Sequence, residues 1–395
     1  MDSVSIDWAG SGLAQLTGQP DGPADFSRSA VLAEARRVTA DIAELTAVEI
    51  DAATVLAGRA ALLGLTRQGR VSAGGATRLL STADGWCAIS LPRADDVEAL
   101  PALLETHTVP ADPWPALTHW AAAHSTQAVV ARALLLDIAA AALNESPPTA
   151  PTVQPIGSGT EPRRPDGLLV ADLSSLWAGP LCAQLLARAG AIVVKVETFA
   201  RPDGTRRGEP AFFDWMNFGK LCYAVEFDND RQALRDLVTA ADVVIEGSRP
   251  AALRRRRLSV DDIPDRPGRV WLRVGGYAGQ PDRPAFGDDA AVAGGLVGVG
   301  ADGPVFCGDA IADPLSGLEA ARAVAQSLRR GGGELIDVSM AGVAARYAAL
   351  PQASSACEAP VAPPRPPPPV PPASPLGADN AAVQRIVSEK RSAPC

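Results

Sequence analysis

The sequence contains only three histidines, and all of them lie in its first third: His107, His119 and His124. From residue 167 onward there is none, so a general base in that part must be Asp, Glu, Lys or Tyr. The six cysteines form no CxxC pair and have no histidine at metal-ligand spacing. We therefore expect free thiols in a reducing compartment and no bound metal.

Long apolar runs and an excess of basic residues are also missing. No stretch approaches the roughly 20 apolar residues of a membrane span, and residues 1–30 show no signal-peptide pattern, so we expect a cytoplasmic protein. The net charge of −9 argues against sequence-independent binding to nucleic acid, which depends on clustered Lys and Arg. One basic run, the four arginines at 254–257, is either a solvated face or a site for nucleotide phosphates.

Composition sets three parts of the chain apart from its core. Residues 1–145 show helical spacing over 28–65 and 114–142, with glycine-punctuated short strands between, which predicts a helical segment plus a small α+β domain. Residues 146–166 are rich in Pro, Ser, Thr and Gly, as is typical of an exposed linker. Residues 351–395 carry a polyproline stretch, which we expect to be a flexible tether or a ligand for an aromatic groove, and a short final helix.

The core, residues 167–350, alternates between apolar strands and helices. Strands are predicted at 168–171, 192–196, 243–245, 270–274 and 334–338, and helices at 180–186, 231–240 and 315–328. Crossover helices between buried strands imply that the strands are parallel. The fold class is therefore predicted to be α/β, with a doubly wound, Rossmann-like parallel sheet as its core.

Asp313 is the first candidate functional residue. Pro314 and an amphipathic run follow it, and Gly331 comes just after the run, which predicts a helix with Asp313 at its N-cap and Pro314 at its first position. A helix cap alone accounts for this pattern. A carboxylate at a helix N-terminus is also kept ionised beside free N–H groups that can stabilise an oxyanion, and it can act as a nucleophile. These residues alone leave both interpretations open.

The turn between the first two strands of the core is a second candidate site. A strand that leads into a helix N-terminus is a ready anion site, and an acidic residue after the next strand, here Glu197, is what a nicotinamide-dinucleotide fold would show. The turn reads SSLWAGP and lacks the GxGxxG motif. A dinucleotide-dependent dehydrogenase is therefore an alternative function, but the glycine motif typical of that class is missing from this turn.

Five stretches of the core match one family in its own order. They are DLSSLWAGPLCAQLLARAGAIVVKVE, FFDWMNFGKLCYAVEFDN, ADVVIEGSRPAALRR, RVGGYAGQPDRPAFGDDAAVAGGLVG and PVFCGDAIADPLSGLEAARAVAQSLRRGGGELIDVSM. Together they span nearly all of residues 168–340 and resemble the family III CoA transferases, the CaiB/BaiF group. That family's catalytic aspartate lies in a D-x-x-x-G that opens a helix, which corresponds here to Asp313 and Gly317. The nearby Asp309 lacks this spacing.

The resemblance implies a CoA transferase with ping-pong chemistry. Asp313 would attack the thioester of an acyl-CoA, the resulting mixed anhydride would become an aspartyl-CoA thioester, and an incoming carboxylic acid would repeat the exchange in reverse. The resemblance also implies coenzyme A as a cosubstrate, no tightly bound cofactor, and an interlocked homodimer. By position in the family, the residues expected to bind CoA are Leu176, Trp177, Ala178, Lys220, Arg255 and Tyr277.

The order of the remaining segments departs from the family. There the core comes first, and a glycine-rich loop and a small domain follow it. Here VSAGGATRLLSTADGWCAISLPRADDV, which resembles that loop and domain, precedes the core, so residues 1–145 resemble the family's second half placed in front. Gly74 and Gly75 then correspond to the loop that shields the active-site thioester, or else form an ordinary hairpin turn.

Two other functions stay open. The α-methylacyl-CoA racemases share the fold and the CoA site but move a proton with a His and an Asp. Here the matching segment, AFGDDAAVAGG, has Asp288 and Asp289 and no histidine, so a carboxylate would have to be the base. A polar turn explains the two aspartates equally well. The rearranged order and the proline-rich tail also suggest a non-catalytic CoA-binding scaffold.

Overall fold

A seven-stranded sheet forms the centre of the computed structural model, which describes residues 3–247 and 250–392. Its strand order is β4-β12-β9-β8-β5-β6-β7. Every pair of neighbouring strands is parallel except the pair of β4 and β12, which is antiparallel. The strands are β4 (Thr152–Pro155), β5 (Leu169–Leu173), β6 (Ile192–Glu197), β7 (Leu221–Ala224), β8 (Val243–Glu246), β9 (Val270–Gly275) and β12 (Glu334–Ser339). The predicted mixed α/β class is confirmed.

The path of the chain through this sheet marks one place of interest. From β5 the chain moves outward to β6 and β7, then returns to β8 on the other side of β5 and continues outward to β9 and β12. The direction of winding therefore reverses between β5 and β8. In open parallel sheets, ligands bind outside the carboxyl ends of the strands at such a reversal.

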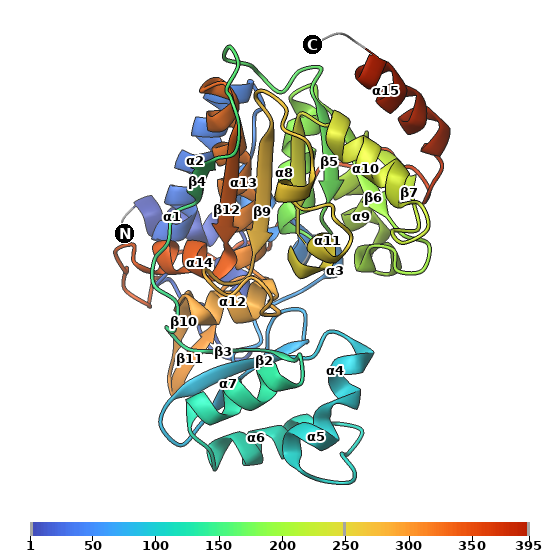
Figure 1. The fold of residues 1–395 in the computed structure, drawn as a ribbon. Helices are drawn as coiled ribbons and strands as arrows, with labels where there is room; N and C mark the ends of the chain where they lie inside the picture. The colour runs from blue at the N-terminus through green and yellow to red at the C-terminus, as the bar shows by residue number, and fades with distance from the viewer. Residues whose placement is uncertain (1–2, 248–249, 393–395) are drawn as a thin grey trace.

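Helices cover both faces of the sheet (Figure 1). On one face, α8 (Ala178–Arg188), α13 (Ala312–Arg329) and α14 (Met340–Ala348) pack with the N-terminal helices around side chains such as Val170. On the other, α10 (Arg231–Ala240), α11 (Pro250–Arg255) and α15 (Asn380–Ser392) pack around Leu169 and Ala171. Because neighbouring residues of one strand enter two apolar cores, these strands read as continuous apolar runs.

The N-terminal helices were predicted as one segment over 28–65, and this was wrong. The structure has α1 (Ser3–Gly10), α2 (Ala30–Thr46) and α3 (Ala52–Leu63). Ala47 ends α2 in a left-handed conformation (φ 64°), and the Asp51 side chain caps α3 by accepting from the backbone N–H groups of Ala53 and Thr54. Helix α2 packs against α13 of the core.

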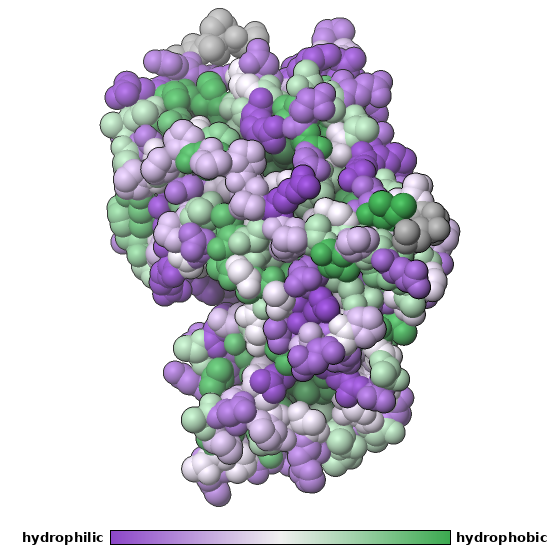
Figure 2. Space-filling view, turned by 180° about the vertical axis from the view of Figure 1, so that it is seen from behind, coloured by the Kyte–Doolittle hydropathy of each residue, from purple (hydrophilic) through white to green (hydrophobic). Residues whose placement is uncertain are grey.

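A smaller lobe lies below the sheet in Figure 1. The view from behind in Figure 2 shows that a narrower region joins it to the rest of the molecule. Three antiparallel strands and four helices build it: β1 (Thr77–Ser81), β2 (Trp86–Ser90), β3 (Ala139–Ala142), α4 (Ala94–Glu98), α5 (Leu100–Leu104), α6 (Trp114–Ala122) and α7 (Thr126–Leu135). The prediction of one helical stretch over 114–142 was wrong: α6 and α7 are separate helices, and the end of the stretch is a strand. Four alanines form β3 there, because pairing with β2 outweighs the helix propensity of alanine.

The elements between the sheet and the lobe are α12 (Gly287–Ala293) and the hairpin of β10 (Val297–Gly300) and β11 (Gly303–Phe306). Helix α9 (Pro210–Asn217) precedes β7. Three single 3₁₀ turns complete the described elements: Ala14–Leu16, Gly204–Arg207 and Val260–Asp262. Helix α12 packs against β2, β3, α13 and α14, so it joins the lobe to the core.

The two irregular segments are more ordered than their composition suggested. The linker contains β4, which extends the sheet edge beside β12. The proline-rich segment runs along the N-terminal helices, where the Ala362 N–H donates to the Ala9 carbonyl, and leads to α15, whose Val383 is buried on the far face of the sheet. Five of the six cysteines are free thiols, and Cys395 lies outside the described residues. Within those residues, every helix is too short or too polar to cross a bilayer.

Candidate functional site

Asp313 lies in the first turn of α13 rather than at its N-cap, so this detail of the prediction was wrong. The helix begins at Ala312 after an N-cap at Ile311, which makes Pro314 its third residue. The reason is that the preceding turn winds directly into the helix, and the Asp313 N–H already donates to the Ala310 carbonyl at 2.9 Å. The Asp313 side chain is half-buried. The predicted end of the helix, just before Gly331, is confirmed.

The glycine four residues after Asp313 has a packing role. A Cβ on Gly317 would lie 2.8 Å from the carbonyl oxygen of Ala178 and 2.8 Å from the Leu181 side chain, closer than Cβ atoms come to other atoms. Only glycine therefore lets α13 approach the first turn of α8 so closely. This contact sets Asp313, one turn earlier on α13, near the start of α8.

A second glycine touches the carboxylate itself. A Cβ on Gly287, the first residue of α12, would lie 2.3 Å from Oδ2 of Asp313 and 2.4 Å from the carbonyl oxygen of Ala310. The Asp313 carboxylate thus rests against the backbone at the N-terminus of α12.

Four carboxylates gather here, and we call them the aspartate cluster: Asp288, Asp289, Asp309 and Asp313. Burial, reinforced by the charge of Asp288, raises the pKa of Asp313 to about 7. Burial raises the pKa of Asp289 to about 7, and burial together with the charge of Asp309 raises the pKa of Asp288 to about 6. Burial also raises the pKa of Asp309. Burial therefore raises the pKa of all four carboxyl groups of the cluster.

The hydrogen bonds of the cluster separate Asp313 from its neighbours. Asp289 accepts from the Phe286 N–H (2.9 Å), the Ser90 hydroxyl (2.9 Å) and the Tyr277 hydroxyl (3.2 Å), and Asp288 accepts from the Ala310 N–H (3.1 Å) and the Thr77 hydroxyl (3.3 Å). Both oxygens of Asp309 accept from Nη1 of Arg59, at 2.6 and 2.7 Å. Within the described residues, no hydrogen bond reaches the Asp313 carboxylate.

The small lobe completes the site from the same chain. Thr77 on β1 and Ser90 on β2 bond to each other at 2.9 Å and to the two aspartates of α12. The turn before β1 holds Gly74 and Gly75, and a Cβ on Gly74 would lie 3.8 Å from Nη2 of Arg59. The structure thus brings the predicted glycine loop to Arg59, which binds Asp309 of the cluster.

Three of the residues predicted to bind CoA are consecutive in the chain. Leu176, Trp177 and Ala178 form the turn at the carboxyl end of β5, where the winding reverses. Leu176 has a left-handed backbone (φ 71°), is 40% exposed, and its N–H donates to the Asp203 carboxylate. Residues other than glycine adopt this backbone conformation infrequently.

The other three expected CoA contacts have different surroundings. Lys220 is buried, and its ammonium donates to Asp172, the Pro180 carbonyl and Asn217 at 3.0–3.1 Å, so it already has three partners inside the protein. Tyr277 is buried and donates to Asp289 of the aspartate cluster. The Arg255 side chain, at the end of α11, is exposed.

Sequence reasoning missed Arg59, Thr77 and Ser90. Arg59 lies 250 positions before its partner Asp309, and no local pattern connects them. One signal was present, since Asp288, Asp289, Asp309 and Asp313 crowd into 26 residues of a core without histidine.

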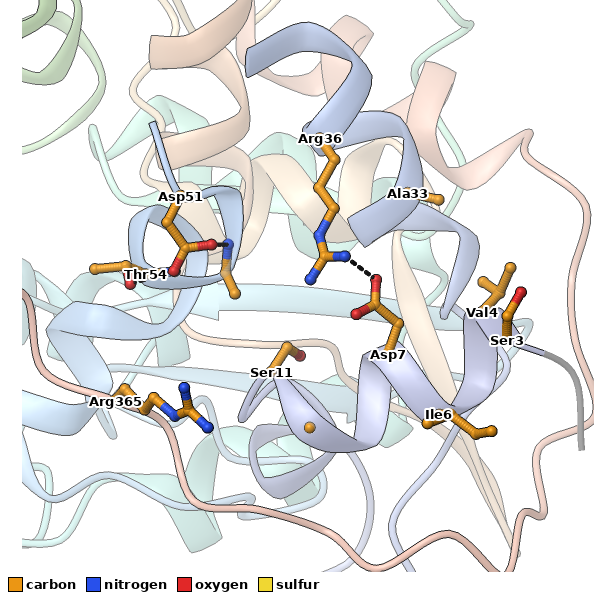
Figure 3. A pocket seen from close by; sticks show the side chains of 12 residues that line it. Ser3, Val4, Ile6, Asp7, Ser11, Ala33, Arg36, Asp51, Thr54 and Arg365 are labelled. Carbon is orange, nitrogen blue, oxygen red and sulfur yellow. Dashed lines mark hydrogen bonds and ion pairs between the residues drawn. The ribbon is translucent and has the colours of Figure 1, made fainter. Parts of the chain in front are cut away.

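A separate pocket of about 700 Å³ lies between α1, α2, α3 and the proline-rich segment (Figure 3). Asp7 and Arg36 form an ion pair of 2.6 Å on its wall, and Asp51 is engaged in capping α3. None of the four clustered aspartates lines it. The pocket offers no reactive group comparable to Asp313.

Comparisons with known proteins identify the family of this chain. The sequence profile of CoA-transferase family III matches residues 166–371. An acyl-CoA transferase of Fusarium pseudograminearum is 33% identical over 202 residues, which are 44% of each chain. The succinyl-CoA--D-citramalate CoA-transferase of Chloroflexus aurantiacus is 30% identical over 205 residues, 46% of this chain and 51% of the relative. The chain spans about half the length of the curated relatives it matches.

Among solved structures, a CaiB/BaiF family protein from Brucella suis superimposes with a TM-score of 0.42 at 26% identity. The match covers 47% of this chain and 55% of that one.

Proposed function

Because this chain belongs to CoA-transferase family III, we propose that it transfers coenzyme A from an acyl-CoA thioester to a carboxylic acid through a covalent intermediate on Asp313. One observation carries the assignment to Asp313. Of the four clustered aspartates, it alone receives no hydrogen bond from the described residues and is free to react. Asp309, the nearest competitor, is 1% exposed and held at both oxygens by Arg59.

The proposed reaction has two matching halves. The Asp313 carboxylate attacks the thioester carbonyl and expels the CoA thiolate, which leaves a mixed anhydride. The thiolate then attacks the aspartyl carbonyl, which releases the donor acid as a carboxylate and leaves an aspartyl-CoA thioester. The acceptor carboxylate attacks this thioester, and the expelled thiolate takes the new acyl group. Asp313 returns to its starting state, and no net proton or electron is exchanged.

The charge environment suits a nucleophile that must give up its charge. Asp313 attacks in its ionised form and becomes neutral in each covalent intermediate. Burial and the neighbouring aspartates destabilise its charged form, as its pKa of about 7 reflects. Near pH 7 a fraction of the Asp313 side chains is still ionised. The negative charge of this ionised form is less stabilised in the site than it would be in water.

We propose that CoA enters over the carboxyl ends of β5 and β8. The doubly wound, Rossmann-like arrangement predicted from the sequence has its ligand crevice there, and Leu176, Trp177 and Ala178 form its floor. Arg255 is the proposed phosphate contact because its side chain is exposed. Lys220 and Tyr277 take supporting roles in this proposal, since both are bonded to aspartates inside the protein.

Gly74 and Gly75 are proposed to shield the reacting thioester. Their loop belongs to the same chain as Asp313, although it precedes the core in sequence. The homodimer implied by the family resemblance stays a prediction, which sedimentation of the purified protein would test.

The test is to trap the intermediate. The protein is incubated with a panel of acyl-CoA donors, including succinyl-CoA, and digested, and the peptides are searched by mass spectrometry for a hydroxylamine-sensitive adduct. We expect the adduct on Asp313 in the native protein and in Asp309→Asn, and none in Asp313→Asn. An adduct that persists in Asp313→Asn, or that maps to Asp309, would contradict the proposal.

Racemisation is a second candidate because of one observation. Asp289 is fully buried with a pKa of about 7, which is the range of a general base. If it serves that purpose, solvent deuterium enters the α-carbon of a 2-methylacyl-CoA without any adduct on Asp313. The same incubations in heavy water therefore distinguish the two reactions.

A further inference from the structure

Arg59 is paired with Asp309 and lies close enough to Asp313 for its charge to lower the pKa of that carboxyl group. It comes from α3, outside the residues that the family profile matches. Its Nη1 bonds both oxygens of Asp309, and its guanidinium carbon lies 5.5 Å from the ring centre of Trp177 and 5.6 Å from that of Phe212. Two aromatic rings and a buried carboxylate thus fix its position, which is the arrangement of a preorganised binding group.

Most of the donors of Arg59 are unused. A guanidinium has five N–H groups, and within the described residues only those on Nη1 make hydrogen bonds. Nη2 faces the glycine loop near Gly74, and the side chain is 25% exposed. The guanidinium donors that stay free match the carboxylate of a small molecule.

The charge of the site makes such a group necessary for an anionic substrate. A carboxylic acid enters and leaves as an anion, and the aspartate cluster repels it. Arg59 is the cation that lowers the pKa of Asp288, Asp309 and Asp313. A carboxylate that undergoes acylation loses its charge, so pairing it with arginine would oppose the reaction. The natural partner of Arg59 is a carboxylate that does not react.

We propose that Arg59 is the specificity-determining residue of the site, and that it binds the second, non-reacting carboxylate of a dicarboxylic acid. This inference rests on the proposed CoA transfer and names its substrate class. The Arg59 side chain would hold one end of the acid while Asp313 exchanges with the other. The glycine loop at Gly74 leaves the free edge of the guanidinium open to it.

Succinate and butyrate make a matched pair for the test, because they differ by a carboxylate in place of a methyl group. Acetyl-CoA serves as the donor, and kcat/KM is measured for each acceptor. We expect the native protein to favour succinate by roughly 10- to 100-fold, the effect of a hydrogen-bonded charge. Arg59→Met should reduce this ratio to about 1. The ratio cancels any effect of Arg59 on Asp313, because both acids meet the same nucleophile.

Two controls separate recognition from structure. Arg78→Met removes an arginine that is stacked on Trp114 at 4.6 Å, in the small lobe, and should keep the succinate preference. Gly74→Asp leaves Arg59 in place but sets a competing carboxylate beside Nη2, and should abolish the preference, whereas Gly74→Ala should retain it. These loop variants keep the test decisive even if Arg59→Met fails to fold.

The inference is overturned if the native protein does not prefer succinate, or if Arg59→Met or Gly74→Asp keeps the preference. Absence of any adduct on Asp313 refutes the proposed transfer instead. A binding measurement distinguishes the two failures. Succinate, but not butyrate, should raise the Tm of the native protein and of Arg78→Met, and should leave Arg59→Met unchanged.

Discussion

Replacement of Gly287 by alanine tests the proposed geometry most directly. The added methyl carbon would lie 2.3 Å from Oδ2 of Asp313 and 2.4 Å from the carbonyl oxygen of Ala310. Weak carbon–oxygen contacts lie about 3.3–3.6 Å apart, so each oxygen must move by about 1 Å. The Ala310 oxygen is backbone and yields little, which leaves the Asp313 carboxylate to take up most of the displacement.

The expected result is a large loss of activity with a moderate loss of stability. A misplacement of about 1 Å at a reacting group lowers the rate by roughly 100-fold. Overpacking of this kind costs about 1–3 kcal/mol of unfolding free energy. We would measure adduct formation on Asp313 by rapid quench and mass spectrometry, and stability by urea unfolding.

Gly275 supplies the matched control. A Cβ there would meet no atom within 4 Å, so Gly275→Ala should retain the native rate and stability. Native adduct formation in Gly287→Ala would refute the reasoning, because it would show that the position of the Asp313 carboxylate against α12 does not matter for the chemistry.

Two further predictions concern charge. Asp288→Asn removes the neighbouring charge that contributes most to raising the pKa of Asp313; since only ionised Asp313 attacks, the rise of adduct formation with pH should move to lower pH, and an unmoved or upward-shifted profile would contradict this. Lys220→Met leaves the buried carboxylate of Asp172 without its ammonium partner and should lower the unfolding free energy by about 3–5 kcal/mol in urea titrations. Arg256→Met breaks a surface ion pair and should change stability little; equal losses in both variants would show that burial of the Lys220 pair is irrelevant.

The elements predicted best from the sequence are the strands that are buried on both faces. Strands such as Ile192–Glu197 and Val270–Gly275 lie between two apolar cores, so their composition alone identified them. The D-x-x-x-G pattern of Asp313 and Gly317 could also be recognised, because both residues lie in one helix. Features set by neighbouring residues on one helix or strand were therefore accessible.

Features set by distant contacts were not. The alanines of β3 read as helix, and only pairing with β2 makes them a strand. Lys220 matched a family lysine, but its burial beside Asp172 depends on two segments 48 positions apart. The ion pair between Arg59 and Asp309 joins the first helices to the core. No periodicity or motif could have predicted these partners, because each arises from packing of the complete chain.

The packing of α2 against α13 has a consequence for folding during synthesis on the ribosome. The apolar side of α2, including Val38 and Ile42, is buried by a helix that is made roughly 270 residues later. At bacterial or eukaryotic elongation rates of about 5–20 residues per second, that is a delay of roughly 13 to 55 s. During this interval the apolar side of α2 stays exposed, because α13 has not yet been made. Efficient production of this chain should therefore depend on holdase chaperones, and slower translation should lower its yield.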